Sequence, residues 1–249
     1  MASEHIVKSY DDELKHLKAL LSRMGGLVEA QIADAMDAVG RRDSELARRT
    51  VDNDAKIDTL EREVDASVVR MLALRQPMAV DLRSILAALK ISSDLERIGD
   101  YATNAAKRAI ALNQMPAARP AGSVPRMGRL VQSIVKDVLD AYVDGDADKA
   151  VAVWRRDEEV DELYNSLFRE LLTYMMEDPR NITPCTHLLF MAKNIERMGD
   201  HATNVAETVY FQVRGQPLKA ERPKGDSTSF TVINPDAKSG QDSKSGQGV

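Results

Sequence analysis

The 249-residue sequence contains one cysteine and no long apolar run. With Cys185 alone, an internal disulfide framework and a zinc site built from several cysteines are excluded. The absence of a run of about 18 apolar residues argues against a membrane-spanning helix. The charged N-terminus also lacks the apolar stretch of a signal peptide. We therefore expect a cytoplasmic protein.

An excess of positive charge is also missing. The 34 Lys and Arg residues are outnumbered by 39 Asp and Glu residues, which gives a formal net charge of −5. A general nucleic-acid-binding protein needs a positive face for the phosphates, so we expect no nucleic-acid partner. Aromatic residues make up 4% of the chain and hydrophobic residues 43%. Aliphatic side chains and methionine must therefore form the core.

Proline is absent before Pro77, and the nine prolines fall in groups along the rest of the chain. Because proline inside a helix costs about 3 kcal/mol, these groups mark boundaries between helices. Two further boundaries combine a glycine with residues that cap helices, at 40–44 and 144–146. The pattern predicts six long helical segments: 10–39, 43–76, 79–113, 124–143, 146–177 and 182–213.

Apolar residues recur in these segments at alternating spacings of three and four, which is typical of one face of a helix. In the last segment this stripe runs from Leu188 to Val209, and the third segment has a matching stripe from Ala88 to Ala109. No Asn-Gly or Asp-Gly turn lies between alternating β-branched runs, so strand signals are nearly absent. The sequence predicts an all-α fold.

An internal repeat divides the helical part of the chain into two copies. Residues 96–106 read ERIGDYATNAA and residues 196–206 read ERMGDHATNVA, so eight of eleven positions are identical at an offset of 100. A weaker match upstream relates 54–58 to 157–161 at an offset of 103. Two matches in the same order, inside corresponding helices, indicate a duplicated three-helix unit.

The repeat predicts two tandem, similar three-helix bundles, the first in 1–115 and the second in 120–214. The segment 215–249 follows them and contains 5 of the 13 glycines and 3 of the 9 prolines. Such a composition buries too little apolar surface to offset the entropy of ordering the chain. We expect this tail to be disordered.

Each copy carries carboxylates four residues apart, which places them on one face of a helix. Two charges about 6 Å apart repel by about 3 kcal/mol at an effective dielectric constant of 20, so a cluster favours open water or a bound cation. Carboxylate oxygens suit hard cations such as Mg²⁺, Ca²⁺, Mn²⁺ or ferric iron. The candidate metal ligands are Asp54, Asp58, Glu96 and Asp100 in the first copy, and Asp157, Asp161, Glu196 and Asp200 in the second.

Glycine and arginine residues next to these carboxylates help to judge whether the carboxylates bind a metal. Gly99 and Gly199 lie inside both repeated helices at a cost of about 1 kcal/mol each relative to alanine, which indicates close approach of another backbone or of a ligand. For Arg97 and Arg197, we favour bonds to a carboxylate across a helix interface over binding of an anion. A solvated acidic face remains the alternative to a metal site.

No catalytic set emerges from the spacing of the residues. The sequence lacks a supported Ser–His–Asp or Cys–His arrangement, a phosphate-binding loop and the Glu-x-x-His pairs of di-iron bundles. His201 follows Asp200 directly and therefore points about 100° away from the carboxylates. We expect no enzyme. The alternatives are a metal-dependent hydrolase or oxidase with carboxylate-bridged ions, and a metal-free helical scaffold.

Two copies of E-R-[IM]-G-D-x-A-T-N-x-A, each preceded by a helix with D-x-x-x-D, resemble the PhoU family of bacteria and archaea. The resemblance covers about residues 5–213. It implies two similar three-helix bundles that bind metal through E/D-x-x-x-D motifs on their surfaces. The eight carboxylates named above would then be the ligands, and iron or zinc the metal, with magnesium or manganese as alternatives.

The resemblance further implies regulation rather than catalysis. A PhoU-like protein is a negative regulator of phosphate uptake and of phosphate-starvation signalling. It acts as an adaptor between the ATPase of the phosphate ABC transporter and a sensor histidine kinase. We accordingly expect a cytoplasmic homodimer that associates with the inner face of the membrane through these partners and does not insert into it.

Overall fold

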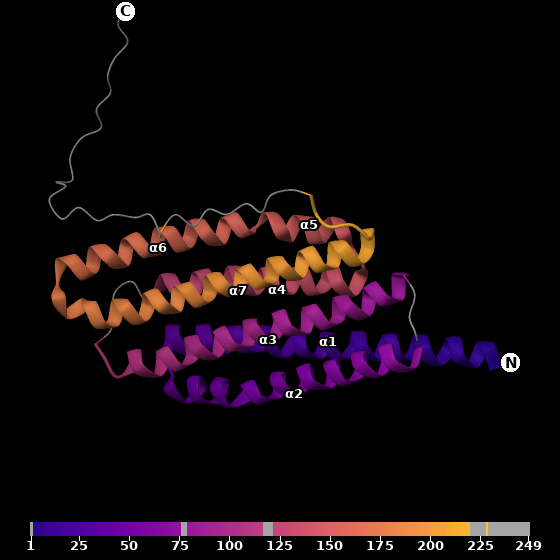
Figure 1. Cartoon of the computed structure of the whole chain (residues 1–249). Helices are drawn as coiled ribbons and strands as arrows, with labels where there is room; N and C mark the ends of the chain where they lie inside the picture. Colours follow the sequence, from indigo (N-terminus) through magenta and orange to yellow (C-terminus); the bar gives the residue numbers. More distant parts are fainter. Residues whose placement is uncertain (1, 76–78, 117–121, 220–227, 229–249) are drawn as a thin grey trace, which may run out of the picture.

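The computed structural model describes residues 2–75, 79–116, 122–219 and 228. Within these ranges the chain forms helices and no strand, which confirms the all-α prediction (Figure 1). The elements in chain order are α1 (Ala2–Arg41), α2 (Ser44–Arg75), α3 (Ala79–Asn113), α4 (Ser123–Asp144), α5 (Ala147–Arg155), α6 (Asp157–Glu177), the short 3₁₀ helix η2 (Pro179–Asn181) and α7 (Ile182–Arg214).

One predicted helix is interrupted. The segment 146–177 is divided into α5 and α6 at Arg156, whose backbone N–H donates to the carbonyl of Val153 at 2.9 Å. The guanidinium of Arg156 donates to Asp137 at 2.8 Å and to Ser133 at 2.9 Å, both on α4. These bonds fix the break against a neighbouring helix. Three acidic residues in the first turn of α6 then complement the helix dipole.

The turn between α1 and α2 differs in detail from its prediction. Gly40 lies inside α1, and Arg42 adopts the left-handed conformation with φ 55°. The guanidinium of Arg42 donates to the carbonyls of Leu112, Asn113 and Met115, at and just beyond the end of α3, where helical carbonyls lack intrahelical partners. Asp43 caps α2 as predicted, because its side chain accepts from the N–H groups of residues 45 and 46.

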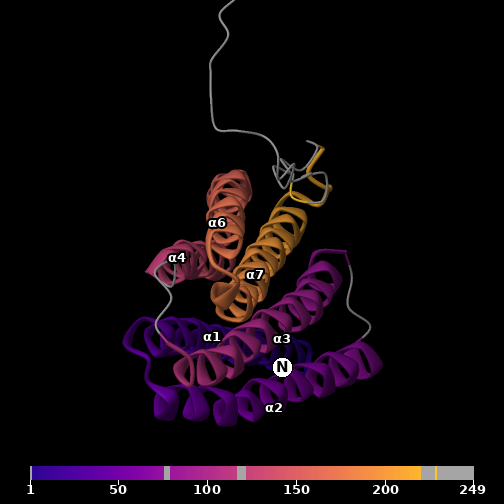
Figure 2. The same ribbon diagram turned by 90° about the vertical axis from the view of Figure 1, so that its left-hand side faces the viewer.

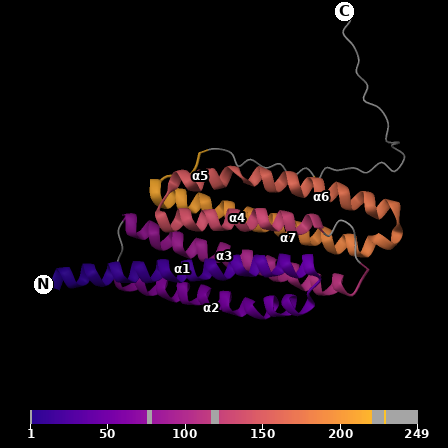
Figure 3. The same ribbon diagram turned by 180° about the vertical axis from the view of Figure 1, so that it is seen from behind.

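The helices form two bundles that lie on one another as two layers (Figures 1 and 2). Helices α1, α2 and α3 make the first bundle, and α4, α5–α6 and α7 make the second. Between the bundles α3 packs on α7 and α1 packs on α4, the latter pair being visible from behind in Figure 3. A single cluster of buried apolar residues extends through both layers. The predicted pair of duplicated bundles is therefore present, and its two halves share a core.

Equivalent residues meet reciprocally between the bundles. A Cβ added to Gly25 on α1 would lie 2.6 Å from Leu139 on α4, and one added to Gly128 on α4 would collide with Met36 on α1. The offset of 103 relates Gly25 to Gly128 and Met36 to Leu139. Such reciprocity is what an approximate two-fold axis between the bundles produces.

The aromatic pair Tyr101 and His201 lies near the same axis. These residues occupy the same position in the two copies, and their ring centroids are 5.7 Å apart. His201 Nδ1 also lies 2.8 Å from Asp94 Oδ1. His201 therefore lies in the contact between α7 and α3, directed away from the carboxylates of its own helix as expected.

Part of the predicted tail and part of the predicted domain boundary lie outside the described residues. Beyond Lys219 the predicted tail lies outside the described residues, except for Thr228. The predicted domain limit at 115 lies shortly before the undescribed segment 117–121, and the limit at 120 lies within it, so both stay predictions. Among the described residues, no helix is both long enough and apolar enough to cross a membrane.

Candidate functional site: two acidic faces

The predicted carboxylates of the first copy gather between α2 and α3. Electrostatic repulsion links Asp100 to Asp54 and Asp58, and links Glu96 to Asp58 and Asp100. A further carboxylate, Glu61, adds to the repulsion on Glu96. We call these five residues, Asp54, Asp58, Glu61, Glu96 and Asp100, the first acidic face.

Burial and repulsion from neighbouring carboxylates make ionisation of Glu96 and Asp100 unfavourable. Burial, followed by repulsion from Asp100 and Glu61, raises the pKa of Glu96 from 4.5 to about 7. Burial and then Asp54 raise the pKa of Asp100. Arg97 opposes both shifts, but its guanidinium nitrogens lie 3.7 Å from Glu96 and from Asp100, and its side chain is 57% exposed. Exposed pairs of this kind contribute little.

Hydrogen bonds from Gln31 hold the side chains beneath the first acidic face. Nε2 of the buried Gln31 donates to Asp54 Oδ1 at 3.1 Å and to Thr103 Oγ1 at 2.5 Å. A Cβ at Gly99 would lie 3.0 Å from Ile57 Cδ1 and 3.3 Å from Gln31 Oε1. The mid-helix glycine thus permits close approach, but the neighbours are side chains and not the backbone or ligand that was predicted.

We expect Glu96→Gln to stabilise the protein at high pH. Because folding raises the pKa of Glu96, the favourable contribution of its protonated form is complete below about pH 4.5 and is lost as the pH rises through about 7. Glutamine mimics the protonated form. After a discount for solvent screening of this partly exposed side chain, we expect a gain of about 1 kcal/mol in unfolding free energy at pH 8 and none at pH 4.

Urea unfolding at both pH values, in the presence of a chelator, measures this difference. Glu45→Gln provides a control, because Glu45 is 71% exposed in a pair with Arg48. An equal effect of Glu96→Gln at pH 4 and pH 8 would contradict the electrostatic explanation.

The second copy places its carboxylates between α6 and α7. Asp157, Asp161 and Glu196 are buried, with exposed fractions of 4%, 4% and 6%, whereas Asp200 is half-buried. Together these four residues form the second acidic face. Gly199 permits the contact between the helices, because a Cβ there would lie 3.3 Å from Val160 Cγ1. Val160 corresponds to Ile57 at the offset of 103, so both faces are built on equivalent helix contacts.

Hydrogen-bond donors occupy part of the second acidic face. Thr203 Oγ1 lies 3.1 Å from Asp157 Oδ1, to which it donates. Lys193 Nζ donates to Glu196 Oε1 at 2.9 Å. Burial raises the pKa of Glu196, the Lys193 bond opposes the shift, and repulsion from Asp200 and Asp161 adds to it. The other oxygen of Glu196, Oε2, is buried without a hydrogen-bond partner.

All eight predicted ligands therefore belong to one acidic face or the other. Their oxygens have the chemistry that hard cations prefer. In the part of the chain that the structure describes, however, no three Asp, Glu, His or Cys side chains are positioned to share one metal ion. The carboxylate oxygens are suitable ligands for a cation, but their positions in this structure do not form a complete coordination site.

The sequence reasoning missed several members of these sites. Glu61 was available as a signal, since it follows Asp58 by three residues on the same helix and thus shares its face. The same spacing relates Thr103 to Asp100 and Lys193 to Glu196, whereas Gln31 lies on another helix and carried no such signal. Arg97 contacts carboxylates of its own helix rather than across an interface, and Arg197 lies across the bundle contact, 5.7 Å from the Tyr101 ring.

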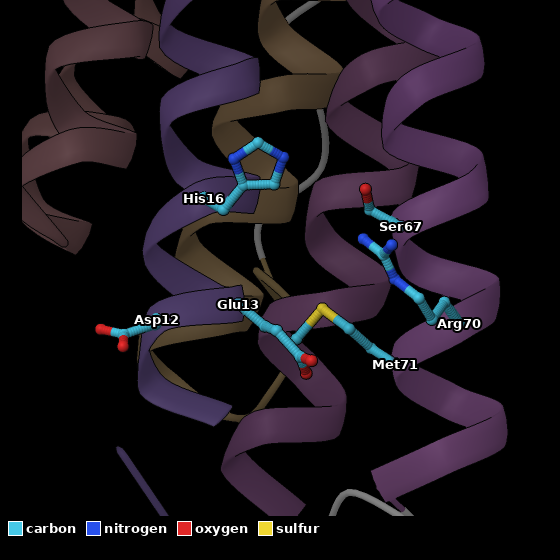
Figure 4. A pocket seen from close by; sticks show the side chains of 6 residues that line it. All are labelled: Asp12, Glu13, His16, Ser67, Arg70 and Met71. Carbon is cyan, nitrogen blue, oxygen red and sulfur yellow. The ribbon is translucent and has the colours of Figure 1, made fainter. Parts of the chain in front are cut away.

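A separate concavity of about 360 Å³ lies between α1 and α2 (Figure 4). It combines acidic, basic and apolar side chains: Asp12, Glu13, His16, Ser67, Arg70 and Met71. Because its charges are of both signs and come from non-repeated positions, it lacks the features that make the acidic faces candidates for cation binding.

Comparisons with known proteins support the duplicated architecture. A family model described as PhoU domain matches residues 21–109 and again 124–209. A phosphate-specific transport system accessory protein PhoU homolog from Caulobacter vibrioides is 56% identical over 228 residues, which are 91% of this chain and 99% of that protein. A homolog of the same name from Rhizobium meliloti is 49% identical over 230 residues, or 92% and 97% of the two chains.

Solved structures are similar in the same way. The crystal structure of PhoU from Pseudomonas aeruginosa has a TM-score of 0.81 at 44% identity and covers 83% of this chain and all of that one. PhoU from Streptococcus pneumoniae, a phosphate transport system regulatory protein, has a TM-score of 0.78 at 28% identity and covers 85% and 100% of the chains. The duplicated motif, the paired bundles and these near full-length matches together show that the chain belongs to the PhoU family.

Proposed function

We propose that this protein is an accessory protein of a phosphate-specific transport system and regulates it without catalysing a reaction. The observation that carries the proposal is the near full-length similarity to relatives named as such accessory proteins. The Streptococcus pneumoniae structure, named as a regulatory protein, supports the same role. The names of these relatives describe accessory and regulatory proteins, which favours regulation over the alternative of a hydrolase or oxidase.

The regulatory mechanism that we propose is that of an adaptor. The protein binds the ATPase of the phosphate ABC transporter and a sensor histidine kinase, and it represses phosphate uptake and the starvation response when phosphate is plentiful. It acts in the cytoplasm at the inner face of the membrane, held there by its partners, and it forms a homodimer. The support is the family resemblance of the repeated motifs.

A strain without the gene provides the test. In phosphate-rich medium we expect such a strain to express its phosphate-starvation genes, and expression of this chain to restore repression. Affinity purification from the same cells should recover the transporter ATPase and the kinase. Failure to restore repression by a folded, expressed chain would overturn the regulatory role. Recovery of neither partner would overturn the adaptor mechanism.

We further propose that a cation binds at the first acidic face. Asp54, Asp58, Glu96 and Asp100 would hold it through carboxylate oxygens. The bound cation would supply the positive charge that the exposed Arg97 provides only weakly. The oxygen ligands favour magnesium, manganese or ferric iron, while the family resemblance favours iron or zinc. The support from the structure is the clustering of partly buried acids, since burial and then mutual repulsion raise the pKa of Glu96 and Asp100.

Metal content per chain tests this proposal. We expect Asp58→Asn/Asp100→Asn to remove the metal that elemental analysis finds in the purified protein, and to abolish the dependence of the melting temperature on a chelator. Asp148→Asn is the control, because Asp148 is 87% exposed beside Arg214. Unchanged metal content in the double variant would show that these are not the ligands. A melting temperature indifferent to chelator in the unmodified protein would favour the metal-free scaffold.

A further inference from the structure

We propose that Lys193 is the built-in cation of the second acidic face, and that this face consequently takes no metal ion. The proposal rests on the proposed metal binding at the first face and deepens it. The two copies of the unit would then differ in function. The first face would bind a cation from solution, and the second face would have its positive charge in the side chain of Lys193.

The geometry around Lys193 supports this role. Its Nζ lies 2.9 Å from Oε1 of Glu196 and 4.9 Å from the centroid of the Tyr164 ring. The Glu196 side chain is 7% exposed and that of Lys193 is 32% exposed, so the pair is largely shielded from water. An ammonium held between a carboxylate and an aromatic face is stabilised by both.

The equivalent positions of the first copy contain the opposite chemistry. At the offset of 100, Lys193 corresponds to Ser93, which is exposed. At the offset of 103, Tyr164 corresponds to Glu61, which belongs to the first acidic face. The second copy therefore has an ammonium group and an aromatic ring where the first copy has a hydroxyl group and a carboxylate. This exchange makes the first face more negative and the second less so.

The second face also offers less to an incoming ion. Asp157 and Asp161 are each 4% exposed, which leaves little room for a hydrated cation to approach. Asp157 accepts from Thr203 and Glu196 accepts from Lys193, so oxygens that could be ligands already have donors. A metal ion here would also be repelled by the nearby ammonium group. The remaining oxygen of Glu196, Oε2, is buried without a hydrogen-bond partner.

Variants of one ligand in each face give the first test. Titration with Mn²⁺, followed by elemental analysis after desalting, should show that Asp100→Asn lowers the bound metal and that Asp200→Asn leaves it unchanged. An equal loss in the two variants would overturn the proposal, because both faces would then bind metal.

Exchange of the charge gives the second test. Ser93→Lys combined with Glu61→Tyr transfers the lysine and the ring to the first face. We expect this variant to lose Mn²⁺ binding and to melt at a higher temperature than the unmodified protein in EDTA. Metal binding retained at the unmodified level would count against an ammonium group as the substitute for the ion.

Removal of the positive charge of Lys193 gives the third test. In EDTA, Lys193→Met should lower the melting temperature by about 5 °C, since it leaves Glu196 buried without its counter-ion. Added Mn²⁺ should raise the melting temperature of Lys193→Met by more than it raises that of the unmodified protein, whose first face alone binds the ion. Lys136→Met, which removes an exposed lysine paired with Asp140 at 2.8 Å, is the matched control and should change little.

The outcomes separate the two proposals. If the unmodified protein binds no Mn²⁺ at all, the metal function proposed for the first face fails, and the melting temperatures in EDTA decide the role of Lys193. If Lys193→Met melts like Lys136→Met in EDTA, the built-in cation fails, whatever the first face binds.

Discussion

Gly25→Val is expected to lower the free energy of unfolding by about 3 kcal/mol. A Cβ at this position would lie 2.6 and 2.9 Å from the two methyl groups of Leu139, and valine adds two more methyl groups to the same space. Helices α1 and α4 would have to separate where the two bundles touch. Because Leu139 is itself nearly buried, it has little space into which to move. Urea unfolding monitored by circular dichroism measures the effect.

The neighbouring glycine is a matched control. Gly26 lies on the same helix, and a Cβ there would meet no atom within 4 Å. Gly26→Ala should therefore stabilise the protein by about 0.5–1 kcal/mol through helix propensity alone. Gly128→Val, at the reciprocal position on α4, should destabilise as Gly25→Val does. If Gly25→Val and Gly26→Ala had similar effects, the close approach of α1 and α4 would be refuted.

Thr203→Val is expected to cost about 2 kcal/mol in unfolding free energy. The substitution keeps the shape of the side chain and removes the hydroxyl that donates to Asp157, whose carboxylate is 4% exposed. Loss of a donor to a buried charged group costs more than loss of a hydrogen bond between neutral groups. Thermal and urea unfolding at pH 7 both measure this cost.

The equivalent threonine of the first copy should be less sensitive. Thr103→Val removes an acceptor of Gln31 Nε2, but that group still donates to Asp54 Oδ1 at 3.1 Å. We expect a cost of about 1 kcal/mol there. The second copy has Ile134 at the position of Gln31, so it lacks this additional donor. A larger cost for Thr103→Val than for Thr203→Val would contradict the proposed difference between the two networks.

The fold could be predicted because its signals are local. Prolines mark boundaries between helices, the capping residue Asp43 marks where α2 begins, and apolar stripes at spacings of three and four mark the buried faces. The break at Arg156 had no such local signal. It is stabilised by bonds to Asp137 and Ser133 on another helix, and such long-range contacts leave no periodic trace in the sequence.

The candidate site could be predicted in its carboxylates and not in their partners. Spacing along a helix places Glu96 beside Asp100, and the repeat then gives the equivalent pair in the second copy. The groups that balance the negative charge of each pair are side chains from other helices or from positions outside the repeated motif. Lys193 lies three residues before Glu196, where lysine is ordinary on a helix surface, so only the structure links it to a buried carboxylate and to Tyr164.

The reciprocal contacts of Gly25 with Leu139 and of Gly128 with Met36 have an evolutionary consequence. The two halves meet as identical subunits of a two-fold dimer would. In such a dimer, every mutation appears on both sides of the axis at once. Fusion of the halves into one polypeptide removes that coupling, so one half can have a lysine where the other has a serine.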